Sequence, residues 1–257
     1  MRKLVPAAFI SIIVIGLLAA APPQTVRLKG IVIYNHTAPV PPPLAVSRKN
    51  CSTVPNETLL IHKKGGLQNV LVFIANIKPE SLPPLELNLA TSACRFQPHV
   101  LALGVGGQLI IRNGDPFLQS VHAQLREFVP GWDRNSTLDI FANSENTYFN
   151  FALPKQGDMT LQKMETPGLI RLRSDAGDEW MSGYILVMPH RYFAITNIEG
   201  KFELPELPPQ RYDVVMWHEK LGVKRQIVDI NAKGKSELII KWFADETASA
   251  PDTAKTN

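Results

Sequence analysis

The sequence has few cysteines, no second long apolar run and no basic stripe. Only two of its 257 residues are cysteines, Cys51 and Cys94. Beyond Ala21 no segment is long and apolar enough to cross a membrane. The formal net charge is +4, and the lysines and arginines are scattered instead of alternating with aromatic residues. This distribution argues against nucleic-acid binding.

The sequence also lacks the usual marks of a catalytic site. No Gly-x-Ser-x-Gly segment is present, which argues against the nucleophile turn of α/β-hydrolases. The pairs Gly65-Gly66 and Gly106-Gly107 fit hairpin turns, and no helix follows them to hold a phosphate group. We find no catalytic constellation and expect that the protein is not an enzyme.

The N-terminus has the order of a secretory signal. Met1, Arg2 and Lys3 place positive charge before an apolar run from Leu4 to Ala21. This pattern predicts a signal peptide over residues 1–21 and a periplasmic or secreted protein. The alternative is an uncleaved membrane anchor, because the run approaches the length that spans a bilayer. On either interpretation, membrane contact is expected only through this segment.

The two cysteines are expected to pair. An exported chain meets an oxidising environment, in which two remaining cysteines usually form a disulfide. A thiolate metal site is the alternative, but neither Cys51 nor Cys94 has a second cysteine or a histidine at the short spacing of such sites. We therefore predict one structural disulfide.

The apolar pattern predicts an all-β fold. Short stretches rich in Val, Ile, Leu and Phe recur between turn residues, and no stretch after the signal keeps helical spacing for long. Spacing of this kind is typical of β-sandwiches. The predicted strands are Val26–Tyr34, Thr58–His62, Asn69–Ile74, Val100–Val105, Gln108–Arg112, Ser120–Gln124, Tyr148–Leu153, Gly168–Arg173, Met181–Val187, Gly200–Leu204, Tyr212–His218, Lys224–Ile230 and Ser236–Trp242.

Proline-rich loops and changes of composition suggest how the chain is divided. The polar stretch between Arg126 and Thr147 fits a lid, a short helix or an ordered excursion, and the sequence does not choose among them. The predicted parts are a signal (1–21), an N-terminal β section (22–92), a central domain (93–188), a C-terminal β unit (189–243) and a disordered tail (244–257).

Two segments resemble plastocyanin-like cupredoxins, especially exported ones related to methylamine-utilisation proteins. The first comprises Cys94–Val100 and the residues from Asn113-Gly114-Asp115-Pro116 to Ala123, and the second runs from Pro167-Gly168 through Ser174 to Ile185. The resemblance covers about Cys94 to Val187 and implies a Greek-key sandwich.

The same resemblance implies four positions at which a blue copper ion would be bound. Such a site needs two imidazoles, one thiolate and a weak axial thioether. Here the first imidazole position is Gln119 and the thiolate position is Ser174. Asp178 takes the second imidazole position, and only Met181 matches the family. We therefore expect no type 1 copper and no bound cofactor.

Other metals remain an alternative at this loop. Gln119, Asp175, Asp178 and Glu179 carry oxygen atoms that suit calcium, magnesium or manganese. The competing interpretation is a solvated loop without a ligand. His122 lies three residues after Gln119, so on a strand the two side chains face opposite sides. We expect His122 to be a hydrogen-bonded packing residue.

The C-terminal part resembles the carboxypeptidase-regulatory-like sandwich, which has a carbohydrate-binding-like fold. The matching pieces include Met188–Asn197 and Gly200-Lys201-Phe202, and strands near Lys29 and Gly66 indicate that the sandwich is shared between both ends of the chain. His190 and His218, with His99 or His122, are candidates for a zinc or copper site. Hydrogen bonding to nearby backbone is the alternative.

These observations lead to one main functional prediction and two alternatives. The main prediction is an exported, non-catalytic binding or scaffold protein, with an envelope protein, an extracellular protein or a glycan as its partner. One alternative is a periplasmic metal-binding or electron-transfer protein with altered ligands, which would take copper or another divalent metal. The other is a carbohydrate-binding module that uses Trp132, Trp180 and Trp217 for stacking.

Overall fold

The computed structural model describes residues 25–34, 41–46, 48, 50–51, 53–129, 140–231 and 237–242. The predicted signal, Trp132 and the predicted disordered tail lie outside these residues. Every regular element in the described ranges is a β-strand, and none of these residues forms a helix long and apolar enough to cross a bilayer. The predicted all-β class is confirmed.

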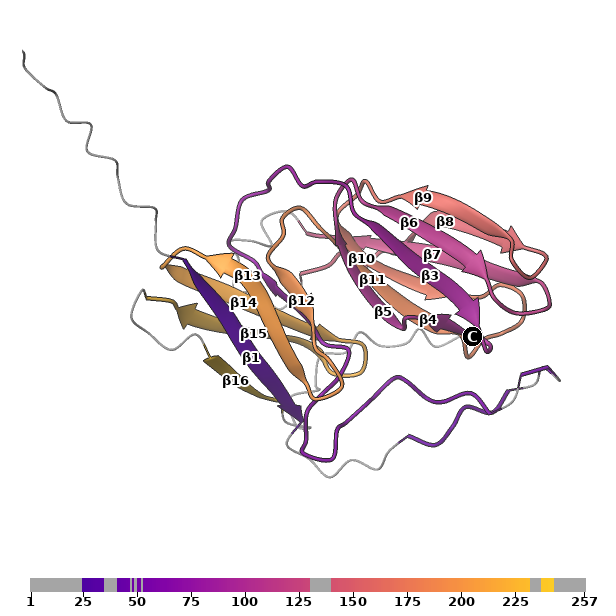
Figure 1. Ribbon diagram of the computed structural model, residues 1–257, viewed down its shortest axis with the longest axis horizontal. Helices are drawn as coiled ribbons and strands as arrows, with labels where there is room; N and C mark the ends of the chain where they lie inside the picture. The colour runs from indigo at the N-terminus through magenta and orange to yellow at the C-terminus, as the bar shows by residue number, and fades with distance from the viewer. Residues whose placement is uncertain are drawn as a thin grey trace, which may run out of the picture.

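Two sheets form a sandwich from the two ends of the described chain, here called the terminal sandwich (Figure 1). Sheet I has the order β13-β1-β16, and sheet II has the order β12-β2-β14-β15. The strand β1 pairs antiparallel with β13 and parallel with β16. The bounds are β1 Val26–Tyr34, β2 Leu71–Ile74, β12 Phe193–Ile195, β13 Lys201–Leu207, β14 Arg211–His218, β15 Gly222–Asp229 and β16 Glu237–Trp242.

The other two sheets form a second sandwich, here called the central sandwich. Sheet III has the order β5-β11-β10-β7-β8, and sheet IV has the order β4-β3-β6-β9. Two parallel pairs, β3 with β6 and β5 with β11, interrupt an otherwise antiparallel arrangement. The bounds are β3 Glu86–Ser92, β4 Arg95–Gln97, β5 Val100–Gly104, β6 Gln108–Asn113, β7 Gln119–Glu127, β8 Asn146–Leu153, β9 Met159–Lys163, β10 Gly168–Arg173 and β11 Ser182–Met188.

Strand pairing shows how the chain divides between the sandwiches. β3 pairs with β6, so the central sandwich begins at Glu86, before the boundary suggested at residue 93. One predicted strand, Thr58–His62, is wrong: within it, only Ile61 makes an isolated bridge, to Leu67.

The four sheets stack in the order I, II, III, IV, with an apolar core between each neighbouring pair. One cluster joins sheets I and II, a second joins sheets II and III, and a third joins sheets III and IV. Sheets II and III are therefore covered on both faces. This explains why all four residues of β2 are buried, whereas β16 alternates between exposed and buried residues. The two sandwiches are consequently packed against each other through the apolar cluster between sheets II and III.

A long connection between β1 and β2 leaves the terminal sandwich and reaches the central one (Figure 1). We call the described residues from 41 to 57 the strap. Leu44 and Val54 form an isolated antiparallel bridge, so the strap doubles back on itself. Near its tip, Cys51 is bonded to Cys94, which directly precedes β4. The strap therefore closes one end of the central sandwich.

Candidate functional site

The four positions implied by the cupredoxin resemblance lie at one end of sheet III. Gln119 begins β7, and Ser174 follows β10, whose last residues pair with the start of β7. Asp178 and Met181 belong to the loop that leads into β11, the other neighbour of β10. Their exposed fractions are 0% for Gln119, 9% for Ser174, 1% for Asp178 and 2% for Met181. All four side chains are therefore buried at this end of the sandwich.

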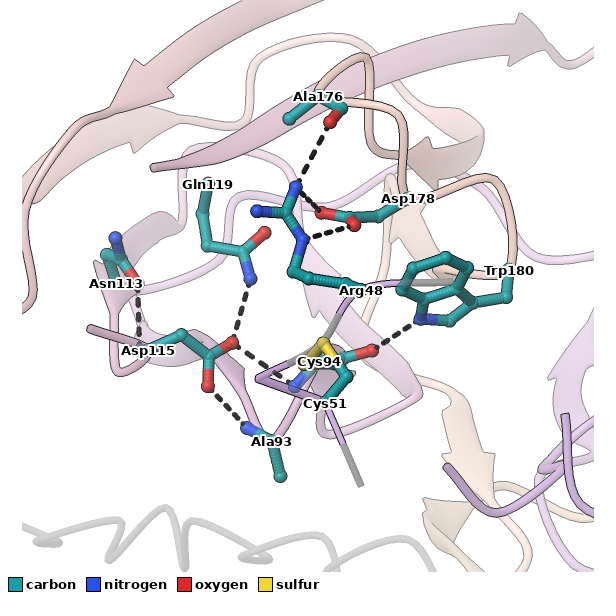
Figure 2. Close-up of a disulfide and its surroundings, with 10 residues drawn as sticks. All are labelled: Arg48, Cys51, Ala93, Cys94, Asn113, Asp115, Gln119, Ala176, Asp178 and Trp180. Atoms are coloured by element: carbon teal, nitrogen blue, oxygen red, sulfur yellow. Dashed lines mark hydrogen bonds and ion pairs between the residues drawn. A yellow bond between two sulfur atoms is a disulfide. The ribbon is translucent and has the colours of Figure 1, made fainter. Parts of the chain in front are cut away.

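Asp178 is neutralised by an arginine of the strap. Arg48 Nε donates to Asp178 Oδ1 at 2.7 Å, and Arg48 Nη2 donates to Asp178 Oδ2 at 3.0 Å (Figure 2). The same Nη2 donates to the carbonyl of Ala176 at 3.1 Å, and the guanidinium lies 4.6 Å from the ring centroid of Phe117. A buried carboxylate needs a paired charge with good geometry, and this two-pronged contact provides it. The positively charged guanidinium of Arg48 therefore already lies against the Asp178 carboxylate.

Gln119 is held by a network that leads to the disulfide. Its Nε2 donates to Asp115 Oδ2 at 2.8 Å (Figure 2). The Asp115 carboxylate also accepts from the backbone N–H groups of Ala93 and Cys94, at 2.8 and 3.2 Å. Gln119 Oε1 is buried and has no hydrogen-bond partner in the described part of the chain. Gln119 therefore uses its amide nitrogen to hold Asp115 and leaves one acceptor unsatisfied.

The disulfide anchors the strap beside this network. The predicted bond between Cys51 and Cys94 is confirmed, and its two cysteines are 43 residues apart. Trp180 Nε1 donates to the carbonyl of Cys94 at 3.0 Å, and the disulfide packs against Val54 and Phe117. Because Cys51 follows Arg48 by three residues, the bond also fixes the place of the guanidinium.

Ser174 and Met181 have structural contacts. Ser174 Oγ accepts from the backbone N–H of Ala176 at 3.2 Å, and Met181 packs in the core of the central sandwich. A hydroxyl does not supply the copper–thiolate bond of a blue copper site. Among the described residues, no group of three or more His, Cys, Asp or Glu side chains is placed to hold a metal ion.

His122 lies in β7, and both of its ring nitrogens are engaged. Its Nδ1 is 2.7 Å from Asp175 Oδ2, and its Nε2 is 2.9 Å from Thr147 Oγ1. Burial alone would raise the pKa of Asp175, but hydrogen bonds to His122 and Asn150 outweigh it, and the pKa is lowered. Glu179, the remaining acidic candidate, is exposed.

The two C-terminal histidines, His190 and His218, lie at different places. His190 follows the end of β11. His218 neighbours His99, which lies beside the start of β11, where the His99 carbonyl accepts from Tyr184 N at 2.9 Å. His190 and His218 each accept a hydrogen bond at Nδ1 from the backbone N–H two residues later. The structure therefore does not gather His190 with His218, and both accept the backbone hydrogen bonds offered as the alternative.

His218 is a buried histidine that remains neutral. Burial lowers its pKa to about 3, and the neighbouring charge of His99 acts in the same direction. The unfolded chain takes up a proton at this position below about pH 6.5, whereas the folded chain does not. Stability is therefore lost as the pH falls from about 6.5 to about 3.

Replacing His218 with asparagine is expected to flatten this acid dependence, because an amide oxygen accepts the Lys220 N–H bond without titrating. In the wild type, His218 lowers the free energy of unfolding by up to about 1.4 kcal/mol for each pH unit of acidification within that window, and the variant should not show this contribution. Urea unfolding between pH 7 and pH 4 measures it. His62→Asn is the matched control, since His62 accepts the same kind of bond from Lys64 but is partly exposed. Parallel pH profiles for the wild type and the His218 variant would contradict the assignment.

Of the tryptophans named for glycan stacking, Trp180 and Trp217 lie in the described residues, and neither has a fully exposed ring. Trp217 is 7% exposed and packs edge-on against Tyr184, with ring centroids 4.9 Å apart. Trp180 is partly buried and donates to the Cys94 carbonyl. The Trp217 ring therefore packs in the interior and does not present a face to solvent on which a sugar could stack.

Comparisons with known proteins give distant matches. No family model and no curated sequence matches the chain. Among solved structures, auracyanin A, a blue copper protein of Chloroflexus aurantiacus, matches 41% of this chain and 99% of its own, with 11% identity and a TM-score of 0.30. Amicyanin from Paracoccus versutus matches 45% of this chain and 96% of its own, with 13% identity and a TM-score of 0.29.

A copper-containing nitrite reductase from Thermus scotoductus is also similar. The match covers 45% of this chain but 26% of the reductase, with 18% identity and a TM-score of 0.28. At these TM-scores the matches carry no argument about this chain. Its fold assignment therefore rests on its own strand pairing.

Proposed function

We propose that this is an exported, non-catalytic β-sandwich protein that acts as a binding or scaffold module without type 1 copper. The observation that carries the proposal is the pairing of Arg48 with Asp178, at the position where the resemblance implies a copper ligand. The proposed partner is an envelope protein, an extracellular protein or a glycan.

The residues at this end of the sandwich do not fit blue copper. Both cysteines are in the disulfide, so neither supplies a thiolate. The nearby imidazole of His122 is engaged by Asp175 and Thr147. A cation that entered beside Asp178 would meet the guanidinium of Arg48, and like charges at close range repel.

One observation favours the competing function, a metal protein with altered ligands. Gln119 Oε1 is a buried acceptor without a hydrogen-bond partner in the described residues, and an amide oxygen suits hard cations. The pairing of Asp178 with Arg48 argues against this function, because the carboxylate would have to release the guanidinium before it could bind a metal ion. We therefore rank this function second.

Copper titration separates the two functions. Purified protein is titrated with copper(II), and the visible spectrum and the bound metal are measured together. The proposal predicts no intense thiolate charge-transfer band and less than one tightly bound copper per chain. Stoichiometric binding without the band would favour the altered site, and a strong band would overturn the proposal. The Asp178→Asn variant serves as the comparison, because only an altered site that uses this carboxylate loses binding with it.

A further inference from the structure

The junction between the two sandwiches contains a buried pair of titratable side chains. His99, between β4 and β5 of the central sandwich, contacts the carboxylate of Glu219 through Nε2. Glu219 follows β14 in the terminal sandwich. Their side chains are 5% and 7% exposed. The pair therefore joins the two sandwiches out of contact with bulk water.

Other charged groups face this pair from each neighbouring element. Glu57 of the strap contributes its charge to His99 and is itself paired with Arg95 of β4 at 3.0 Å. From the terminal sandwich, His218 and Lys220 flank Glu219, and His218 stays neutral because burial lowers its pKa. Among these groups, His99 is the one that contacts the Glu219 carboxylate, so its protonation decides whether that negative charge is paired with a positive one.

The hydrogen bonds of His99 suit its protonated form. One ring nitrogen contacts Glu219, and the ring also makes a hydrogen bond with the backbone of Ser182. An imidazole that donates from both nitrogens carries a positive charge. Burial alone would lower the pKa of His99, but the hydrogen bond and charge of Glu219, with the charge of Glu57, outweigh it, and the pKa is raised.

Tyr184 lies beside the same pair. Its ring is in edge-on contact with both His99 and Trp217, at centroid distances of 6.1 and 4.9 Å. Burial, aided by the negative charge of Glu219, raises the pKa of Tyr184 to about 12. Tyr184 therefore stays neutral over the range in which His99 titrates, and Trp217 is placed to report on the junction.

We propose that His99 and Glu219 form a pH-dependent latch between the two sandwiches, which holds the junction most firmly while His99 is protonated and is weakened when His99 gives up its proton. Deprotonation leaves the Glu219 carboxylate buried without a paired charge, which is unfavourable. Because the pKa of His99 is raised in the folded chain, this contribution is fully present below about pH 6.5 and disappears as the pH rises through the folded value. The apolar cluster between sheets II and III keeps the sandwiches in contact, so the latch sets how firmly they are held.

A double-mutant cycle on the full chain tests the latch. His99→Gln, Glu219→Gln and the double variant are unfolded in urea at pH 6 and at pH 9.5. At pH 6 each single change is expected to raise the unfolding equilibrium constant about 100-fold, because it leaves one buried partner without its charge. The double variant is expected to show strong coupling at pH 6 and clearly weaker coupling at pH 9.5, where neutral His99 can keep a hydrogen bond but not the charge. Equal coupling at both pH values would overturn the proposal.

Histidine and indole NMR titrations of the wild type test the same idea without depending on variants that fold. The His99 midpoint is expected above 6.5, and the Trp217 indole resonance is expected to move with that midpoint. His122→Gln is the control, because the partners of His122 all lie in the central sandwich, and it should leave both titrations unchanged. A His99 midpoint at or below 6.5, or a Trp217 signal that does not follow it, would refute the latch.

Discussion

Replacing Arg48 with methionine is expected to lower the free energy of unfolding by about 3 kcal/mol. The substitution keeps much of the packing against Phe117 but leaves the Asp178 carboxylate, 1% exposed, without a countercharge. Breaking a buried pair by removing one partner costs about 3–5 kcal/mol, and Arg48 lies near the low end because its side chain is 27% exposed. Urea unfolding at pH 7 measures the change.

Two further variants make this result specific. Arg48→Met combined with Asp178→Leu should recover most of the loss, because a buried ion pair can often be replaced by apolar residues of similar volume. Arg27→Met, which removes an exposed pair with Glu203, should leave the free energy of unfolding almost unchanged. If the Arg48 variant is as stable as the Arg27 variant, the buried Asp178 carboxylate does not need the countercharge that the strap provides.

Removing the disulfide is expected to cost about 4 kcal/mol. Cys51 and Cys94 are 43 residues apart, and the chain-entropy relation gives about this value for a loop of that length. The double variant Cys51→Ser/Cys94→Ser is compared with the wild type by urea unfolding under non-reducing conditions.

The loss of the disulfide should not add to the loss of Arg48. The bond fixes the strap tip that carries the guanidinium, so the two changes act on one structure, and neighbouring changes of this kind couple. In the background without the disulfide, Arg48→Met is expected to cost clearly less than it does in the wild type. An undiminished cost would show that Arg48 reaches Asp178 without the bond.

Local sequence signals predicted several parts of the fold. The residues Asn197 to Phe202 have the composition of a tight turn that enters the predicted strand Gly200–Leu204. In the structure Gly200 has φ of +77°, and Asn197 Oδ1 accepts from the N–H groups of Glu199 and Lys201. Such turns are encoded by neighbouring residues, which is why they are legible in one sequence. The disulfide was predictable for a different reason, because a chain expected to be exported has only two cysteines to pair.

Strands with weak patterns were missed. β9, Met159–Lys163, has no buried residue and two exposed apolar ones, Met159 and Leu161, so its sequence shows no burial pattern. β3, Glu86–Ser92, begins next to a proline-rich loop and mixes polar with apolar residues. Both strands are defined by partners elsewhere in the chain, above all β6, which lies between them.

The partner of Asp178 could not be predicted from the sequence. Arg48 lies 130 residues before it, in a stretch where no motif singles out this arginine. The resemblance pointed to Asp178 as a lost ligand position but gave no reason to expect a countercharge. The one available signal was Cys51, because a disulfide to Cys94 necessarily brings Arg48 near the start of the central sandwich.

A crystal of the wild-type protein soaked in copper(II), with anomalous diffraction recorded above the copper absorption edge, tests the central claim most directly. The account predicts no copper peak between Gln119 and Asp178, with the Arg48 guanidinium bound to the Asp178 carboxylate. A copper peak at that position, with Arg48 displaced from Asp178, would contradict it.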